Sequence, residues 1–114
     1  MKSTIIQGNE YIQSLIRSKW VPEIIHGLSS NNDRFSLLKR HIADIGDTEL
    51  KRKLRYLVRA GVVEKSVNGH QVRYCLTSFG HELEHLFAHI RDIGTRYGNG
   101  AVTKASTVHP DDYL

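Results

Sequence analysis

A segment between Asp47 and Ala60 combines a row of leucines with a dense set of basic side chains. Leu50, Leu54 and Leu57 recur at the spacing of one helix face, which predicts an amphipathic helix that stops at Gly61. At about 100° per residue, the positions of this helix that a core does not use are Thr48, Lys51, Arg52, Arg55 and Arg59, with Lys53 on a flank. Arginine forks bind guanine edges or phosphates, and threonine contacts a phosphate or a thymine methyl group. The stripe therefore indicates a recognition helix for the major groove of DNA.

Two short segments behind this helix alternate between apolar and polar residues. Residues 62–67 and 70–76 flank Asn68-Gly69, which predicts a hairpin with these two residues as its turn. This register sets two pairs opposite each other, Glu64 with Arg73 and Val63 with Tyr74. A hairpin directly after a helix-turn-helix is a wing, and its candidate contacts to a phosphate or the minor groove are Lys65, Asn68, His70 and Arg73. A hydrophilic hairpin tip would explain any one of these four residues equally well.

Three apolar patterns upstream predict the helices that must position the basic helix. They run from Asn9 to about Lys19, from Val21 to Leu28 with Pro22 in the first turn, and from Ser36, as the cap, to Ile45. The break at residues 46–48 is short, and two helices joined by such a turn form a helix-turn-helix. A basic helix face on its own is more often simply solvated, but its place between this turn and a wing favours DNA contact. Lys39 and Arg40 rank lower, as ordinary surface residues that could reach the DNA backbone.

A long apolar stripe follows the hairpin. Thr77 or Ser78 is expected to cap a helix whose stripe consists of Leu83, Leu86, Phe87, Ile90, Ile93, Gly94 and Tyr97. A lone domain of this size has little core left to cover such a stripe. We therefore expect it to form the interface of a homodimer.

The overall composition fits a polyanionic partner. The 114 residues carry 16 Lys and Arg against 12 Asp and Glu, for a formal charge of +4 and a pI near 9.4. One domain is expected over residues 1–97, and the Gly, Asn, Thr, Ser and Asp that follow predict a flexible tail over residues 98–114. No apolar run reaches the roughly 20 residues that span a bilayer, so we expect a cytoplasmic protein without membrane contact. No phosphate loop, activated nucleophile or carboxylate pair suggests an enzyme, and nothing indicates a cofactor.

Cysteine and histidine residues offer two further hypotheses. Cys75 is the single cysteine, which excludes an intrachain disulfide and fits a reducing compartment. Strand alternation places it on the face of Arg73, and a neighbouring cation favours the reactive thiolate, but an inert thiol is the preferred interpretation. His81, His85 and His89 repeat at a spacing able to bind one metal ion. Because this row lies opposite the apolar stripe, we expect a solvated face and no metal.

Several short motifs together resemble the HxlR family of bacterial regulators. They are Lys19-Trp20, Arg34-Phe35-Ser36, Leu50-x-x-x-Leu54-x-x-Leu57-x-x-x-Gly61 and Tyr74-x-Leu76-Thr77-x-x-Gly80, within a match over residues 7–97. The resemblance implies a winged-helix dimer, joined through its first and last helices, that acts at promoters as a repressor or activator. It thereby adds Tyr11 and Leu15 to the predicted dimer interface.

Three features depart from the family pattern. Members that sense electrophiles or oxidants carry a cysteine ahead of the first helix, and Gln7 stands at that position here, so the usual thiol switch is absent. Arg17-Ser18 replaces the Gly-Gly that commonly precedes Lys-Trp, and the wing is shorter than usual.

The sequence thus predicts a mainly α fold with a small β-hairpin (α+β), a winged helix-turn-helix domain with N- and C-terminal dimerisation helices. The predicted function is transcription regulation by a homodimer bound to double-stranded DNA, with any small-molecule effector unknown. The alternative is a winged-helix module for protein interaction, which an apolar or acidic outward face on the basic helix would favour.

Overall fold

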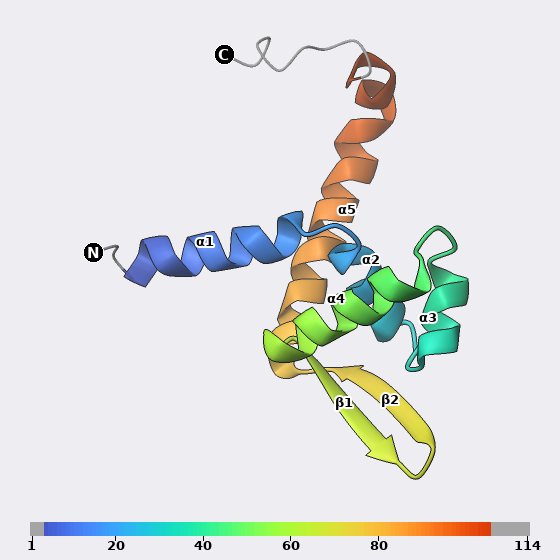
Figure 1. The fold of residues 1–114 in the computed structure, drawn as a ribbon. Coiled ribbons are helices and arrows are strands. Elements are labelled where there is room, and N and C mark those ends of the chain that lie inside the picture. Colours follow the sequence, from blue (N-terminus) through green and yellow to red (C-terminus); the bar gives the residue numbers. More distant parts are fainter. Residues whose placement is uncertain (1–3, 106–114) are drawn as a thin grey trace. The chain divides into compact units, whose positions relative to one another are not determined.

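A computed structural model describes the chain over residues 4–105, with side-chain environments for residues 7–98. Within that range the chain forms five helices and one two-stranded antiparallel sheet (Figure 1). The elements in order are α1 (Thr4–Arg17), α2 (Val21–Ser29), α3 (Phe35–His41), α4 (Asp47–Arg59), β1 (Val63–Asn68), β2 (Gln71–Leu76) and α5 (Ser78–Ala105). The predicted fold class, mainly α with one hairpin, is confirmed.

The chain divides into two units within α5. Residues up to Glu84 form the first unit, and residues from His85 onward form the second. The change of composition at Gly98 does not end the helix, which continues to Ala105. A glycine inside a helix costs only about 1 kcal/mol and weakens the helix without stopping it. The rest of the predicted tail lies outside the described residues.

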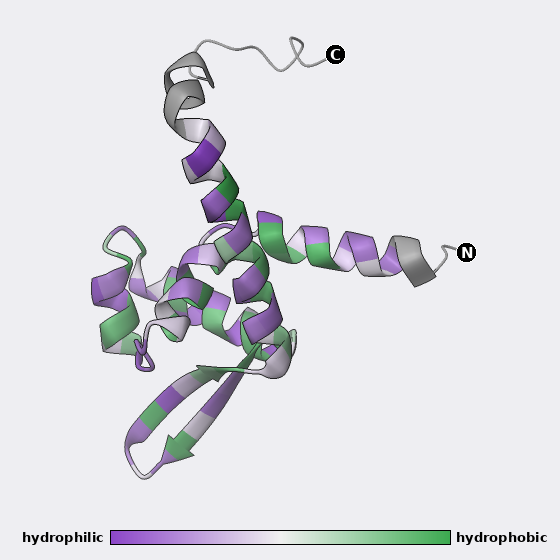
Figure 2. Cartoon of the chain, turned by 180° about the vertical axis from the view of Figure 1, so that it is seen from behind, coloured by the Kyte–Doolittle hydropathy of each residue, from purple (hydrophilic) through white to green (hydrophobic). Residues whose placement is uncertain are grey.

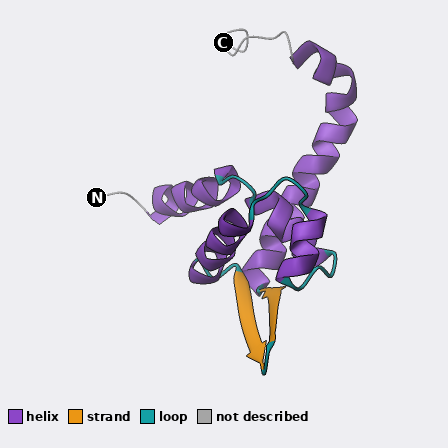
Figure 3. Ribbon diagram, turned by 45° about the vertical axis from the view of Figure 1, so that its right-hand side comes forward, coloured by secondary structure: helices purple, strands orange, loops and turns teal. Residues whose placement is uncertain are grey.

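The core of the first unit fixes the orientation of α4. Its most deeply buried side chains include Leu15 of α1, Ile24 and Ile25 of α2, Leu38 of α3, and Leu50, Leu54 and Leu57 of α4. Each fully buried Leu or Ile contributes roughly 1.5–3 kcal/mol relative to an exposed position. Figure 3 shows α2, α3 and α4 above one end of the hairpin, while α1 projects to the side. The leucine row of α4 faces this core as predicted, and its opposite face is left to solvent.

The first and third helices differ from their predicted bounds. α1 begins at Thr4, ahead of the expected start. The prediction that Ser36 caps the third helix is wrong, because Phe35 is already helical and Arg34 takes the cap position with an extended backbone. α3 also ends early, at His41. Ile42 and Ile45 belong to the turn, where both are buried, so their apolar spacing imitated one more turn of helix.

The hairpin turns one residue later than predicted. Asn68 pairs with Gln71, which leaves Gly69 and His70 as the two-residue turn. Gly69 has a φ of 64°, and His70 keeps a negative φ. A turn that needs one positive φ, at its first central residue, is satisfied by a single glycine there. Asn68 therefore stays in the strand.

The later turn moves every cross-strand pair. The predicted pairing of Glu64 with Arg73 and of Val63 with Tyr74 is wrong, since Glu64 lies opposite Cys75 and Val63 opposite Leu76. Each partner moves two positions along β2, so every side chain keeps its predicted face of the hairpin. Lys65 and Tyr74 now face each other directly.

The hairpin returns the chain to α5 through Thr77. The Thr77 hydroxyl accepts a hydrogen bond from the backbone N–H of Gly80 (3.1 Å), which confirms the predicted cap. It also lies 2.6 Å from the carbonyl oxygen of Gly61, so it ties the end of α4 to the start of α5. A Cβ on Gly80 would stand 2.3 Å from the carbonyl oxygen of Val62, so only glycine allows this close approach.

Candidate nucleic-acid interface

The free face of α4 carries the predicted basic stripe. Leu50, Leu54 and Leu57 are at most 2% exposed. All five candidates on this helix are exposed, namely Thr48, Lys51, Arg52, Arg55 and Arg59. Asp47 and Glu49 lie in the first turn, where negative charge interacts favourably with the helix dipole. The geometry therefore offers a continuous row of hydrogen-bond donors to a partner outside the fold.

The cations of this row differ in their electrostatic environment. The guanidinium of Arg52 forms an ion pair with Glu49, one turn earlier on the same face. The ammonium of Lys51 lies 5.7 Å from the centre of the Phe35 ring. Among the described residues, neither Arg55 nor Arg59 has an ion-pair partner. An anionic ligand would meet the positive charge of Arg55 and Arg59 without displacing a carboxylate.

A lysine on α3 stabilises the turn that sets the angle of α4. The Lys39 ammonium donates a hydrogen bond to the carbonyl oxygen of Ile45 and lies 3.2 Å from the Asp47 carboxylate. These contacts bridge the helix-turn-helix from one side to the other. The sequence offered Lys39 as a weak candidate for DNA contact. In the structure its ammonium instead contacts the turn at Ile45 and the start of α4 at Asp47.

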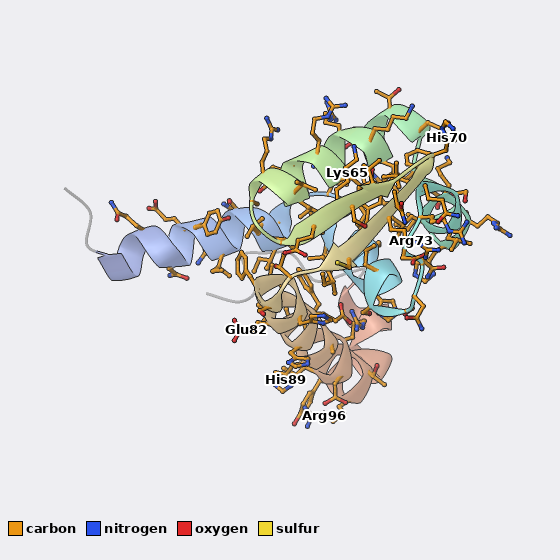
Figure 4. All side chains as sticks on the ribbon, turned by 90° about the horizontal axis from the view of Figure 1, so that it is seen from below. Lys65, His70, Arg73, Glu82, His89 and Arg96 are labelled. Atoms are coloured by element: carbon orange, nitrogen blue, oxygen red, sulfur yellow. The ribbon has the colours of Figure 1, made fainter. Side chains whose placement is uncertain are left out.

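The wing candidates fall into two groups. Lys65, Asn68 and His70 are exposed along β1 and the turn. Arg73 in β2 pairs with Asp33 ahead of α3, and its Nη1 donates to the Asp33 carboxylate at 2.6 Å. The backbone N–H of Tyr74 also donates to the carbonyl oxygen of Asp33, at 2.8 Å. Figure 4 shows Lys65 on the side of the hairpin toward α4 and Arg73 nearer α3. Arg73 therefore anchors the wing.

Lys53 on the flank of α4 joins the basic surface to the turn between α1 and α2. Its ammonium donates a hydrogen bond to the hydroxyl of Ser18 (2.8 Å), and both residues line a hollow of about 230 Å³ with Arg52, Tyr56 and Arg59. Sequence reasoning placed Lys53 beside the stripe but missed Ser18 and Tyr56. The spacing of Tyr56 on α4 was available as a signal, whereas Ser18 is more than thirty positions away in the chain.

The predicted dimer residues separate into buried and exposed sets. Leu15, Leu83 and Phe87 are at most 4% exposed, so within a single copy they belong to its own core. Tyr11 donates from its hydroxyl to the carbonyl oxygen of Ala60 (2.9 Å), and its ring stacks on Phe79. The residues that remain exposed along α5 are Leu86, Ile90, Ile93 and Tyr97, at 38%, 48%, 40% and 70%. Figure 2 shows hydrophobic and hydrophilic residues side by side along this helix.

The environment of Cys75 differs from the sequence expectation. The thiol is exposed and lies 4.0 Å from the carboxylate of Glu64, while Arg73 on the same face is paired with Asp33. The charged group in contact with the thiol is therefore an anion.

The described part of the chain holds neither a metal-ligand cluster nor a membrane-spanning helix. Within it, no three His, Cys, Asp or Glu side chains come together as a metal site would require. No helix there is both long and apolar enough to cross a bilayer.

Comparison with known proteins places this geometry in a family. The model of the HxlR-like helix-turn-helix family matches residues 15–101. The HTH-type transcriptional regulator YdeP of Bacillus subtilis, itself uncharacterized, is 31% identical over 86 residues, which are 73% of this chain and 67% of YdeP. The redox regulator HypR in its reduced form is similar in structure, with a TM-score of 0.75 at 26% identity over 84% of this chain and 98% of HypR. Diamide-treated YodB from B. subtilis has a TM-score of 0.66 at 25% identity, over 85% of this chain and 96% of YodB. This chain belongs to the HxlR-like helix-turn-helix family of transcriptional regulators.

Proposed function

We propose that the chain is a cytoplasmic homodimer that regulates transcription by binding promoter DNA, with α4 in the major groove and the hairpin as a wing. The observation that carries the proposal is the exposed basic row on α4, which lies opposite a leucine row that is buried in the core. An outward face of this composition matches the phosphates and guanine edges of a duplex.

The residues of the row take different roles in this proposal. Arg52 and Arg55 read base edges, because both lie on the outward face in the middle of the helix. Thr48, Lys51 and Arg59 contact phosphates on either side of the groove. Lys65, Asn68 and His70 of the wing reach the adjoining backbone or minor groove. Arg73 acts through its ion pair with Asp33, which holds the wing at a fixed angle.

Dimerisation places two copies of α4 on one face of the DNA. The exposed side chains of Leu86, Ile90, Ile93 and Tyr97 supply an apolar surface that one copy leaves in water. Residues 1–97 then make up the functional unit. In this proposal α1 contributes to the dimer interface through those of its side chains that are exposed in a single copy. Two-fold symmetry sets the half-sites about 10 base pairs apart, or a multiple of that.

The test starts from fragments selected out of genomic DNA by the full-length protein. Fluorescence anisotropy then gives the affinity for one selected duplex and for a scrambled duplex at several salt concentrations. We expect the selected duplex to bind at least about 1000-fold more tightly, with an affinity that falls steeply as salt rises. Equal, weak binding to both sequences would contradict the proposal and favour the protein-interaction alternative.

A further inference from the structure

A cavity of about 570 Å³ lies between α4 and the hairpin, within the first unit of the chain. Phe35 of α3, Val58 of α4, and Val72 and Tyr74 of β2 supply much of its apolar lining. Its volume falls within the range of small-molecule pockets, which are mostly apolar with a few polar groups that converge on the ligand.

The apolar part of the lining is accessible and partly dehydrated. Phe35, Val58, Val72 and Tyr74 are all half-buried, so each shows part of its surface to the cavity. Burial raises the pKa of the Tyr74 phenol above its ordinary value of 10.0. The rings of Phe35 and Tyr74 offer surfaces on which a planar ligand can stack.

Three cations line the same cavity, namely Lys51, Arg55 and Lys65. All three are exposed, and none has an ion-pair partner among the described residues. By contrast, Lys39, Arg52 and Arg73, which do not line the cavity, each pair with a carboxylate. The cavity therefore concentrates uncompensated positive charge beside apolar surface.

A DNA phosphate would use the cations and leave the apolar lining bare, whereas an aromatic acid would use both. We propose that the cavity binds a small aromatic carboxylate, with its ring against Phe35, Val72 and Tyr74 and its carboxylate toward Lys51, Arg55 and Lys65. The same cations contact DNA in the proposed function, so occupation of the cavity competes with DNA. This competition rests on the proposed function, but binding of the carboxylate does not.

Calorimetric titration of the full chain with 2-naphthoate tests the ligand site directly. We expect one saturable site per chain, with 2-naphthalenemethanol binding at least about tenfold more weakly because it lacks the charge. Inorganic phosphate at the same concentration should give no saturable binding. Absence of saturation with 2-naphthoate, equal affinity for the alcohol, or equal affinity for phosphate would each overturn the proposal.

Two variants locate the site. Val72→Thr keeps the β-branched shape but puts a hydroxyl group in the apolar lining, and Lys65→Gln removes one cation. Each should weaken 2-naphthoate at least about fivefold. The matched controls are Val67→Thr, at the position opposite Val72 that is 63% exposed and outside the cavity, and Arg40→Gln on the surface of α3. Equal effects of a variant and its control would refute the location.

Displacement of a labelled duplex by 2-naphthoate tests the regulatory half. Release should reach its midpoint near the dissociation constant for 2-naphthoate, once the DNA concentration is taken into account, and Val72→Thr should shift that midpoint upward. If the protein binds DNA and 2-naphthoate together with unchanged DNA affinity, the proposed competition is wrong. The binding site for 2-naphthoate measured by calorimetry would not be affected by that result. A chain that binds 2-naphthoate but no DNA would overturn the proposed function alone.

Discussion

α4 and the later part of α5 use opposite chemistry on their free faces. On α4 the apolar side is buried in the core, where Leu50, Leu54 and Leu57 are at most 2% exposed. The remaining face of α4 is basic. On α5 four apolar side chains stay between 38% and 70% exposed, namely Leu86, Ile90, Ile93 and Tyr97. Both helices are amphipathic, so amphipathicity alone does not say which face is available to a partner.

The difference follows from what each helix packs against. A helix whose apolar side is already buried has only its polar side available to a ligand. On α4 that polar side is basic and fits a polyanion. A helix with an unsatisfied apolar side gains from covering it, at roughly 25 cal/mol for each Å² of apolar surface removed from water. The comparison predicts DNA on α4 and a second copy of the chain on α5.

The largest effect is expected from charge placed on the α5 surface. Ile90→Asp combined with Ile93→Asp buries two carboxylates in the proposed interface, so the dimer should dissociate and affinity for a two-half-site duplex should fall at least about 100-fold. Light scattering and anisotropy measure the two quantities. His89→Asp, which adds an acid at another exposed position of α5, is the control. A wild-type chain that is monomeric at micromolar concentration would contradict this half of the comparison.

The next effect concerns a cation of α4 that has no carboxylate partner among the described residues. Arg55→Ala should cost about 1–3 kcal/mol of affinity for the selected duplex if the side chain reads a base, with little change in thermal stability. Arg40→Ala on α3 removes the same charge from a surface outside the α4 row. Similar losses for both variants would show that net charge alone drives binding.

A smaller effect of opposite sign is expected at Glu49. Glu49→Gln removes the partner of Arg52 and an anion from the basic face, so DNA affinity should rise a few-fold. The salt dependence should steepen as well, because the variant faces the DNA phosphates with one negative charge fewer. Anisotropy of the variant against salt measures both. Unchanged affinity and slope would show that Arg52 and Glu49 lie outside the interface.

The smallest effect is expected from oxidation. The resemblance described above puts Gln7 where oxidant-sensing members carry a cysteine, and the thiol of Cys75 contacts a carboxylate on the wing. Wings held in separate grooves lie about 34 Å apart, too far for a disulfide between two copies of Cys75. Diamide should therefore change operator affinity less than about twofold. A change above about tenfold that Cys75→Ser abolishes would identify the wing thiol as a sensor.

The local elements of the fold were predictable because their signals are short in range. The leucine spacing of α4, the proline at the start of α2, and the Thr77 cap each act within one or two helical turns. The errors lie where two local signals competed. A glycine at either turn position allows a hairpin, and the apolar residues of a turn can continue a helical pattern, as Ile42 and Ile45 do.

The sequence by itself determined the order of the elements, the basic face of α4 and the apolar stripe of α5, because hydrophobic periodicity needs only neighbours along the chain. The tertiary structure decided which of those side chains are free. Arg73 meets Asp33 across forty positions, and Lys53 meets Ser18 across thirty-five. Leu15 and Phe87 are buried, while Ile90 in the same kind of stripe is not. Ion pairs, burial and the cavity beside Lys65 depend on segments distant in sequence that folding brings together, and no spacing rule encodes those contacts.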